Sequence, residues 1–378
     1  MASGPLQGLK VVEFAGLGPG PFCGMLLSDM GADVVRIDRK SDGSRRDTRL
    51  EVDGRGRRSL ALDLKRHESI ELCLKLCEAA EVVFEGYRPG VMERLGLGPD
   101  VVLKRNPRII YGRMTGWGQY GPYADRAGHD LNYISVTGAL DAIGTRDKPI
   151  PPLNLVGDYA GGAMFLAVGV LAAVLNARSS GQGQVVDVAM TDGAAYLTAV
   201  FHKLRALGLW QEERNANLLD GGAPFYDTYR CADGKWVSVA AIEPQFYEVL
   251  LEKTGLRGKI KGAQMDKSQW PVMKAAFVEV FATRSRAQWC EVMGSADACF
   301  APVLSISEAM QDPHNVARAT FIEIDGVPQP APAPRFSRTP GAVQVSVQGP
   351  DADGWDVLQA WGLSPAYSDE LAAAGVIA

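Results

Sequence analysis

The sequence lacks several features that mark common classes of protein. Among its 378 residues, 39 lysines and arginines stand against 44 aspartates and glutamates, so no basic excess indicates a nucleic-acid partner. The N-terminal residues contain no basic stretch followed by an apolar run, and we expect no signal or transit peptide. The longest apolar run, residues 160–175, is shorter than the ~20 residues that span a bilayer, and we interpret it as a buried helix. We therefore expect a cytoplasmic protein with no membrane or nucleic-acid partner.

Cysteine and histidine are also scarce. The six cysteines form no Cys-x-x-Cys pair and lie near none of the four histidines at metal-ligand spacing, so no metal site is expected. Cys73 and Cys77 share a stripe with Ile70 and Leu74, which is the spacing of the buried face of an amphipathic helix. This pattern favours core thiols over a disulfide.

Glycine, by contrast, is abundant. The 42 glycines make up about 11% of the chain, against an average of about 7%. Because glycine permits tight turns and close backbone approaches, the excess predicts many of both. The apolar share of 47% and the charged share of 22% are ordinary for a globular protein, and the length suggests two or three domains.

Strands and helices alternate in the N-terminal half of the chain. A buried strand, a glycine-rich turn, a short helix and a second strand follow one another over residues 11–38, which is a βαβ signature. The pattern recurs over residues 60–85, and a further strand is expected at 109–114. The sequence therefore predicts an α/β fold with a parallel sheet.

The pattern changes after about residue 214. A hairpin is predicted from strands 226–231 and 236–240, followed by helices near 245–254, 270–282 and 286–293. This indicates a smaller α+β domain. The proline-dense stretch 327–342 is expected to be an extended connection, and the helical tail 351–378 to dock back on the first domain.

The turn at residues 16–24 resembles a dinucleotide-binding turn in its position but not in its spacing. A G-x-G-x-x-G fingerprint starting at Gly16 would need glycine at Pro21, and one starting at Gly18 would need it at Cys23. Asp38 does lie 20 residues after Gly18, where a ribose-binding acid would stand. The broken fingerprint disfavours nicotinamide binding. The remaining interpretations are a plain tight turn and a turn that faces another ligand.

Four basic residues follow predicted strands: Arg39, Lys65, Arg88 and Arg94. Ligands of open α/β sheets bind at the carboxyl ends of the strands, so these cations suit a phosphate-bearing ligand. Arg88 also stands beside Tyr87 on a loop framed by glycine and proline, where the two could clamp an adenine and its phosphates. The alternative is solvated surface charge.

Three residues are candidates for acid–base chemistry. His129 follows a long irregular loop, and its imidazole titrates near neutrality; the alternative is a structural hydrogen-bonding residue. Asp158 precedes the long apolar helix, where it would either cap that helix or act as a base beside amides that stabilise a developing anion. Glu243 stands between a strand and a helix, and is either a helix cap or a functional carboxylate.

Taken together, these segments resemble the α-methylacyl-CoA racemase family within the family III CoA-transferase superfamily. The resemblance runs along nearly the whole chain and includes Gly-Leu-Gly-Pro-Gly-Pro-Phe-Cys at residues 16–23. The other segments that carry it are Ala32–Arg39, Leu62–Lys65, Glu85–Gly98, Met114–Gln119, Gly128–Tyr133, Pro151–Asp158, Leu219–Pro224, Ala241–Phe246 and Pro334–Arg338.

The resemblance implies roles for individual residues. His129 and Asp158 would be the two acid–base residues, and Glu243 would hydrogen-bond and orient His129. The coenzyme A site would include Arg39, Leu62, Asp63, Leu64, Lys65, Gly86, Tyr87, Arg88, Arg94, Gly128, Asp130, Leu131, Asn132 and Tyr133. Met190, Leu218 and Phe225 are candidates for an apolar acyl path.

The resemblance also implies an architecture, that of an interlocked homodimer. A large Rossmann-like domain would comprise residues 1–190 and 332–378, and a small α+β domain residues 226–312, with linkers at 191–225 and 313–331. The active site would lie between the large domain of one chain and the small domain of the other. Glu243 would then come from the partner chain.

The implied activity is that of an isomerase of fatty acid and lipid metabolism, which interconverts (R)- and (S)-2-methylacyl-CoA thioesters. It would need no metal, flavin or nicotinamide, because coenzyme A is part of the substrate. The alternative within the superfamily is CoA transfer, in which Asp158 would attack the thioester carbonyl and form a mixed anhydride. An oxidoreductase and a non-catalytic CoA-binding protein are the remaining alternatives.

Overall fold

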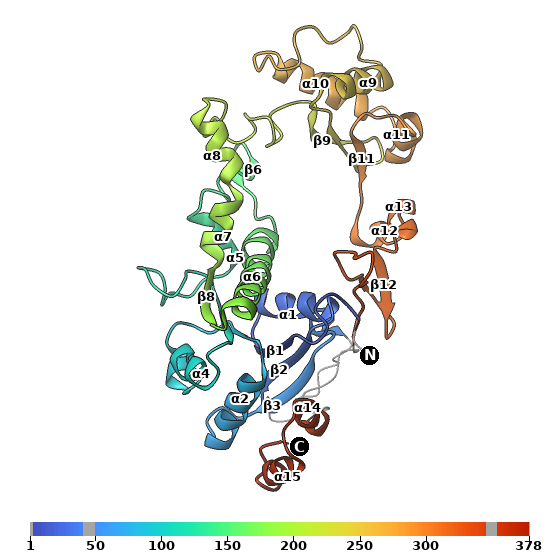
Figure 1. Cartoon of the computed structure of the whole chain (residues 1–378). Helices are drawn as coiled ribbons and strands as arrows, with labels where there is room; N and C mark the ends of the chain where they lie inside the picture. The colour runs from blue at the N-terminus through green and yellow to red at the C-terminus, as the bar shows by residue number, and fades with distance from the viewer. Residues whose placement is uncertain (1–2, 41–49, 345–353, 378) are drawn as a thin grey trace. The chain divides into compact units, whose positions relative to one another are not determined.

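The computed structural model describes residues 3–40, 50–344 and 354–377. The chain divides into two compact units, which are described separately (Figure 1). Unit 1 comprises Met1–Thr137, Pro152–Leu197 and Phe321–Ala378, and unit 2 comprises Gly138–Pro151 and Thr198–Thr320. Each of the two units therefore contains segments that are far apart in the sequence.

Unit 1 is built on a six-stranded parallel sheet with the strand order β3-β2-β1-β4-β5-β8. This confirms the predicted parallel α/β fold. The strands are β1 (Lys10–Phe14), β2 (Asp33–Arg39), β3 (Arg58–Leu62), β4 (Val82–Glu85), β5 (Ile110–Thr115) and β8 (Gln184–Ala189).

Successive strand residues point to opposite sides of this sheet, and helices cover both of its faces. Val11 of β1 packs with α1 (Pro19–Asp29) and α6 (Met164–Ser180), whereas Val12 packs with α2 (His67–Ala79) and α4 (Pro99–Arg105). Cys73 and Cys77 are buried free thiols in the α2 core, as predicted. The tail helices α14 (Gly354–Ala360) and α15 (Pro365–Ala373) dock on that same core, which confirms the expected return of the C-terminus.

Unit 2 contains a three-stranded antiparallel sheet, in the order β11-β10-β9, and it confirms the predicted hairpin. The strands are β9 (Tyr226–Arg230), β10 (Trp236–Ala240) and β11 (Phe300–Val303). Aromatic side chains fill its core, where Tyr229 stacks on Phe281 with ring centroids 5.1 Å apart. The core helices are α9 (Pro244–Thr254), α10 (Trp270–Phe281) and α11 (Arg286–Met293), and the unit also contains β6 (Gly144–Thr145), β7 (Lys148–Pro149), α8 (Ala199–Ala206), α12 (Ile306–Ala309) and α13 (Pro313–Ala317).

The structure differs from the sequence prediction in several elements. Helix α1 begins at Pro19, within the turn expected at residues 16–24, because proline is well suited to the first position of a helix. Residues 327–342 are not only an extended connection, since β13 (Val327–Pro330) pairs with β12 (Phe321–Ile324). The two predicted linkers contain regular structure: α8 and most of α7 (Met190–Leu197) lie within 191–225, and α13, β12 and β13 lie within 313–331.

One helical segment among the described residues, Leu155–Ser180, is long and apolar enough by length and composition to cross a membrane. Half of its apolar 18-residue window is buried inside the structure, and the core helix of a soluble protein meets the same criterion. It consists of the π-helix η3 (Leu155–Ala163) continued by α6, which packs on β5 and β8.

Candidate active site

The strand order places a candidate site at the carboxyl ends of β1 and β4. β1 lies between β2 and β4, so the connections from β1 and β4 lead to opposite sides of the sheet. Ligands of doubly wound folds bind in the crevice at such a reversal. The turn that leads into α1 follows β1 here, and Gly86–Arg88 follow β4. The polar residues predicted from the sequence can now be placed around this edge.

Asp158 lies inside η3, not at its start. The residue that precedes the helix is Asn154, so the predicted alternative of a helix cap at Asp158 is wrong. Asn154 Nδ2 donates a hydrogen bond to Asp158 Oδ2 at 3.2 Å. A Cβ added to Gly18 at the start of α1 would stand 3.0 Å from that same oxygen. The carboxylate of Asp158 is therefore seated against the glycine turn of β1–α1.

The pKa of the Asp158 carboxyl is raised, chiefly because burial disfavours its charged form. The hydrogen bond from Asn154 and the nearby charge of His129 oppose this shift, whereas the charge of Asp130 adds to it. A carboxylate with a raised pKa is a stronger base, and it also carries a proton more readily as an acid. Asp158 is thus suited to proton transfer in either direction.

His129 lies directly before α5 (Asp130–Ser135), a short helix that the sequence analysis did not predict. Its side chain is exposed, and its backbone N–H donates to Asn132 Oδ1 at 3.1 Å. The Tyr133 hydroxyl donates to the carbonyl of Gly128, and a Cβ on Gly128 would meet the Tyr133 ring at 2.7 Å. Asn132 and Tyr133 thus hold the backbone on which His129 stands.

Asp130 connects the two candidate bases. Its Oδ2 accepts a hydrogen bond from the backbone N–H of Asp158 at 2.7 Å, although 28 residues separate them in sequence. This corrects one expectation: the Asp158 amide is already paired, so it is not available to stabilise a developing anion. The bond brings the start of α5, and hence His129, to the Asp158 region of η3.

Aromatic packing orders the loop that leads to His129. The Trp117 ring meets Tyr133 edge to face at 4.8 Å and Tyr123 at 5.1 Å, and Arg126 lies over the Tyr123 ring at 4.4 Å. The Trp117 Nε1–H donates to the Arg126 carbonyl at 3.2 Å. The loop between β5 and α5 is therefore a packed structure, although its sequence predicted only an irregular segment.

The predicted coenzyme A residues gather at the same edge of the sheet. Arg39 and Leu62 end β2 and β3, Asp63–Lys65 follow β3, Gly86–Arg88 follow β4, and Arg94 ends α3 (Val91–Arg94). Burial raises the pKa of Tyr87, and the charge of Arg39 opposes that shift. Burial likewise raises the pKa of Tyr133, with Asp158 adding to the shift and Arg88 opposing it. Arg88 and Asp158 are thus both close enough to influence Tyr133 electrostatically.

A buried ion-pair network that the sequence analysis missed supports the loop after β4. Arg113 of β5 donates to Glu85 Oε1 at 3.1 Å and to Glu93 Oε1 at 2.8 Å, and Glu85 Oε2 accepts the Tyr87 amide at 2.6 Å. These contacts connect two strand ends to α3 and hold Gly86–Arg88 between them. The sequence signal for this network was the position of Arg113 near the end of the strand expected at residues 109–114.

Glu243 belongs to unit 2, whereas His129 and Asp158 belong to unit 1. It stands directly before α9 and is exposed, and its side chain makes no capping hydrogen bond. Glu243 is nevertheless the N-cap residue of α9, so its position agrees with the predicted alternative of helix capping, although no side-chain hydrogen bond contributes to the cap. Of the candidates for the acyl path, Phe225 is fully buried in the core of unit 2 and cannot line an open path. Exposed apolar side chains stand nearer to Asp158 in sequence at Leu153 and Leu155, and Leu17 is an exposed apolar residue directly before Gly18, which lies against the Asp158 carboxylate.

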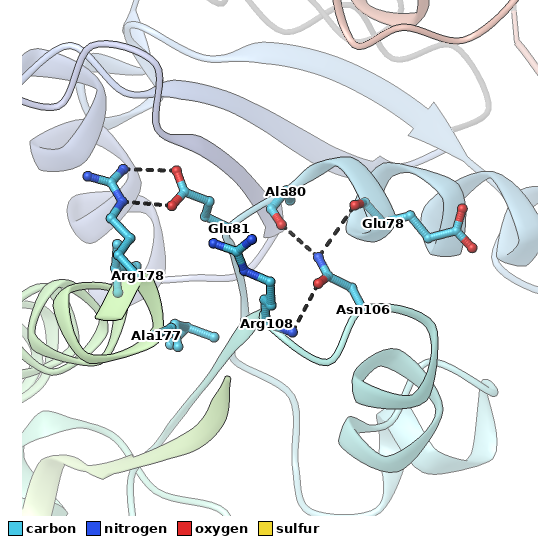
Figure 2. Close-up of a pocket in the computed structure, with 9 residues that line it drawn as sticks. Glu78, Ala80, Glu81, Asn106, Arg108, Ala177 and Arg178 are labelled. Atoms are coloured by element: carbon cyan, nitrogen blue, oxygen red, sulfur yellow. Dashed lines mark hydrogen bonds and ion pairs between the residues drawn. The ribbon is translucent and has the colours of Figure 1, made fainter. Parts of the chain in front are cut away.

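A surface cavity of about 270 Å³ lies at the opposite, amino-terminal edge of the sheet (Figure 2). Its polar walls are largely paired with one another: Arg178 Nε and Nη2 each donate to Glu81 at 2.9 Å, and Asn106 Nδ2 donates to the Ala80 carbonyl at 2.9 Å. This cavity shares no residue with the candidate site. Across the described ranges, no group of three or more His, Cys, Asp or Glu residues could hold a metal ion.

Comparisons with known proteins identify the family of the chain. Residues 6–355 match the model of CoA-transferase family III. The chain is 46% identical over 364 residues to the alpha-methylacyl-CoA racemase of Mus musculus, covering 95% of this chain and 94% of that protein. The same protein of Homo sapiens is 46% identical over 347 residues, covering 89% and 90%. A CAIB/BAIF family protein from Brucella suis superposes with a TM-score of 0.81 at 25% identity, over 95% of this chain and all of that one.

Proposed function

The chain belongs to CoA-transferase family III, and on that premise we propose that it interconverts (R)- and (S)-2-methylacyl-CoA thioesters. One observation in the structure carries the proposal: two groups able to take and return a proton, His129 and Asp158, converge at the carboxyl edge of the parallel sheet. The 46% identity to two racemases over most of the chain supports this activity over others in the family.

Inversion at the α-carbon requires a base on each face. A thioester carbonyl is weakly resonance-stabilised, so its α-hydrogen is more acidic than that of an ester or an amide. One base removes this proton, an enolate forms, and the other residue delivers a proton to the opposite face. We assign His129 to the (S) substrate and Asp158 to the (R) substrate. The reaction needs no further cofactor, because the two proton transfers leave no net oxidation or group transfer.

The basic edge of the sheet suits the coenzyme A moiety. We propose that Arg39, Lys65, Arg88 and Arg94 bind its phosphates and that Tyr87 contacts its adenine. The network around Arg113 would keep the loop after β4 in place for this purpose. The acyl end of the thioester would then reach the region of Tyr133 and Asp158, since Arg88 and Tyr133 are close enough to influence each other electrostatically.

We propose a homodimer in which Glu243 of one chain orients His129 of the other. Glu243 is an exposed carboxylate in unit 2, and His129 is exposed in unit 1. Apolar side chains are exposed on the helices of unit 1: Val168 at 64%, Leu175 at 71% and Tyr196 at 73%. Exposed apolar surface of this kind is typical of a protein interface.

Incubation with (S)-2-methylacyl-CoA in deuterated water tests the proposed activity. We expect deuterium at the α-carbon and formation of the (R) epimer, both followed by mass spectrometry and chiral chromatography. Absence of both products would refute the proposal. CoA transfer is tested by adding a free carboxylic acid and measuring a new thioester. Transfer that is lost in Asp158→Ala but kept in His129→Ala would instead identify Asp158 as a nucleophile.

A further inference from the structure

The carboxylate of Asp130 is placed in a way that coenzyme A binding does not explain. The residue is only 5% exposed, although it lies beside the exposed His129. Its Oδ2 accepts the Asp158 amide at 2.7 Å, and its Oδ1 is buried without a hydrogen-bond partner among the residues that the structure describes. The side chain therefore faces η3 instead of the open edge where the phosphates would bind.

The surrounding backbone is shaped to admit this carboxylate. A Cβ added to Gly157 would stand 2.6 Å from Asp130 Oδ2 and 2.9 Å from its Cγ. Gly157 directly precedes Asp158, so the absence of a side chain there lets the Asp130 carboxylate reach the amide of Asp158. Asp130 of α5 and Gly157 of η3 thus both contribute to one contact, between the Asp130 carboxylate and the Asp158 amide.

The charge of Asp130 needs an explanation beyond the hydrogen bond. An asparagine at position 130 could still accept the Asp158 amide, through a weaker neutral hydrogen bond, and would avoid the cost of burying a carboxylate with one unpaired oxygen. A negative charge beside Asp158 disfavours the ionised form of that residue and so strengthens it as a base. We propose that Asp130 is a positioning residue that orients Asp158 through its amide and strengthens Asp158 as a base through its own negative charge.

Among the residues that the structure describes, few other charged groups act on Asp158. His129, at the start of α5, opposes the effect of Asp130, and Tyr133 of α5 lies within electrostatic range. Helix α1 presents Gly18 to Asp158, and its one acidic residue, Asp29, is paired with Arg55 at 2.6 Å. Helix α7 packs on η3, but its Asp192 acts on Asp187. Asp130 is thus the carboxylate that adds to the raised pKa of Asp158.

This inference rests on the proposed racemase function, and the Asp130→Asn variant tests it. The amide oxygen can still accept the Asp158 N–H, but the charge is gone. We expect α-deuteration of (R)-2-methylacyl-CoA at pH 7 to slow by about threefold to tenfold, and the acid limb of its pH profile to move to lower pH by about one unit. Deuteration of the (S) epimer and KM for both epimers should change less than about twofold. Asp130→Ala should lose more, because it also removes the hydrogen bond.

Two further variants make the result interpretable. Asp125→Asn removes an exposed carboxylate from the preceding loop and should leave both epimers and the pH profile unchanged. Gly157→Ala should reproduce the selective loss for the (R) epimer, because its added Cβ would displace the Asp130 carboxylate from the Asp158 amide. Residue 130 remains an aspartate in this variant. If Asp130→Asn folds poorly, as judged by its thermal unfolding, Gly157→Ala carries the test alone.

Other outcomes would overturn the inference. An unchanged acid limb in Asp130→Asn would show that its charge does not act on Asp158. An equal loss for both epimers with weaker coenzyme A binding by calorimetry would make Asp130 a ligand-binding residue. A titration of the Asp158 carboxyl followed by ¹³C NMR gives a readout without catalysis, and its pKa should fall in Asp130→Asn. If the wild type deuterates neither epimer, the racemase proposal fails, while this titration still tests Asp130.

Discussion

At the residue scale, the two candidate bases stand in different surroundings. His129 is exposed at the start of a short helix, whereas Asp158 is half-buried in a π-helix, a conformation often found at functional sites. Burial raises the pKa of Asp158, which moves a carboxylate closer to the basicity of an imidazole. A base for each face of the α-carbon suits a reaction whose substrate and product differ only in handedness.

Single substitutions should separate the two bases. In His129→Ala, we expect α-deuteration of the (S) epimer to fall by about 10²–10⁴-fold while exchange from the (R) epimer persists. Asp158→Ala should show the reverse selectivity, and both variants should lose net racemisation. Deuterium incorporation from each pure epimer measures this. Equal loss of exchange from both epimers in each variant would contradict a two-base mechanism with one base for each face.

Gly18 is a second sensitive position. Its φ of 70° is unfavourable for other residues, and an added Cβ would stand 3.0 Å from Asp158 Oδ2. We expect Gly18→Ala to lower the free energy of unfolding by about 1 kcal/mol and to slow exchange from the (R) epimer severalfold. Gly20→Ala is the matched control, because no atom lies within 4 Å of its added Cβ. Urea unfolding and epimer-specific exchange provide the measurements, and similar behaviour of the two variants would argue against the contact.

At the scale of elements, the strands were the most predictable part of the fold. β1, β2 and β4 are short apolar runs bounded by glycines or charges, and each lies within about two residues of its predicted position. The basic residues after these strands followed from the same pattern, because parallel strands end at one edge. Local periodicity therefore predicted the parallel sheet and the edge at which its strands end.

The elements that hold the two bases were less accessible to sequence analysis. η3 contains Gly157, Gly161 and Gly162, which disfavour a helix locally. Its conformation depends on tertiary contacts instead, since a Cβ on Gly193 of α7 would stand 1.9 Å from the Gly161 carbonyl oxygen. The link between Asp130 and Asp158 spans 28 residues, and local spacing cannot reveal it.

The buried carboxylate of β1 predicts how stability depends on pH. Burial raises the pKa of Glu13 to about 7, although Arg57 Nε lies 3.1 Å away and opposes the shift. Between about pH 4.5 and pH 7 the folded chain therefore holds a proton that the unfolded chain has lost, so this contribution to stability decreases as the pH rises. In Glu13→Gln, the decrease between pH 5 and pH 8 should be smaller by roughly 3 kcal/mol.

Urea unfolding at pH 5 and pH 8 measures this difference. Glu279→Gln, at an exposed position of α10, is the control and should keep the pH dependence of the wild type. Glu85 of β4 also has a pKa raised by burial to about 7, so part of the dependence should remain in Glu13→Gln. A pH dependence identical to that of the wild type would show that Glu13 is ionised in the folded state throughout this range.

At the scale of the whole molecule, the candidate residues are divided between two units. His129 and Asp158 belong to unit 1, which has a core on each face of its sheet, and Glu243 belongs to unit 2, which has its own aromatic core. Each unit can therefore hold its own candidate residues in place through its own core. The proposed homodimer predicts that Glu243 orients His129 of the partner chain and not His129 of its own chain.

Mixing two defective variants distinguishes these assemblies. His129→Ala and Glu243→Ala should each have low activity alone. In a dimer whose sites combine unit 1 of one chain with unit 2 of the other, a mixed dimer contains one site with both defects and one with neither. Random co-refolding makes about half of the dimers mixed, so about a quarter of the wild-type activity should return. If Glu243 instead acted within its own chain, every site would keep one defect, and racemisation by the co-refolded mixture would be no faster than the mean of the two variants.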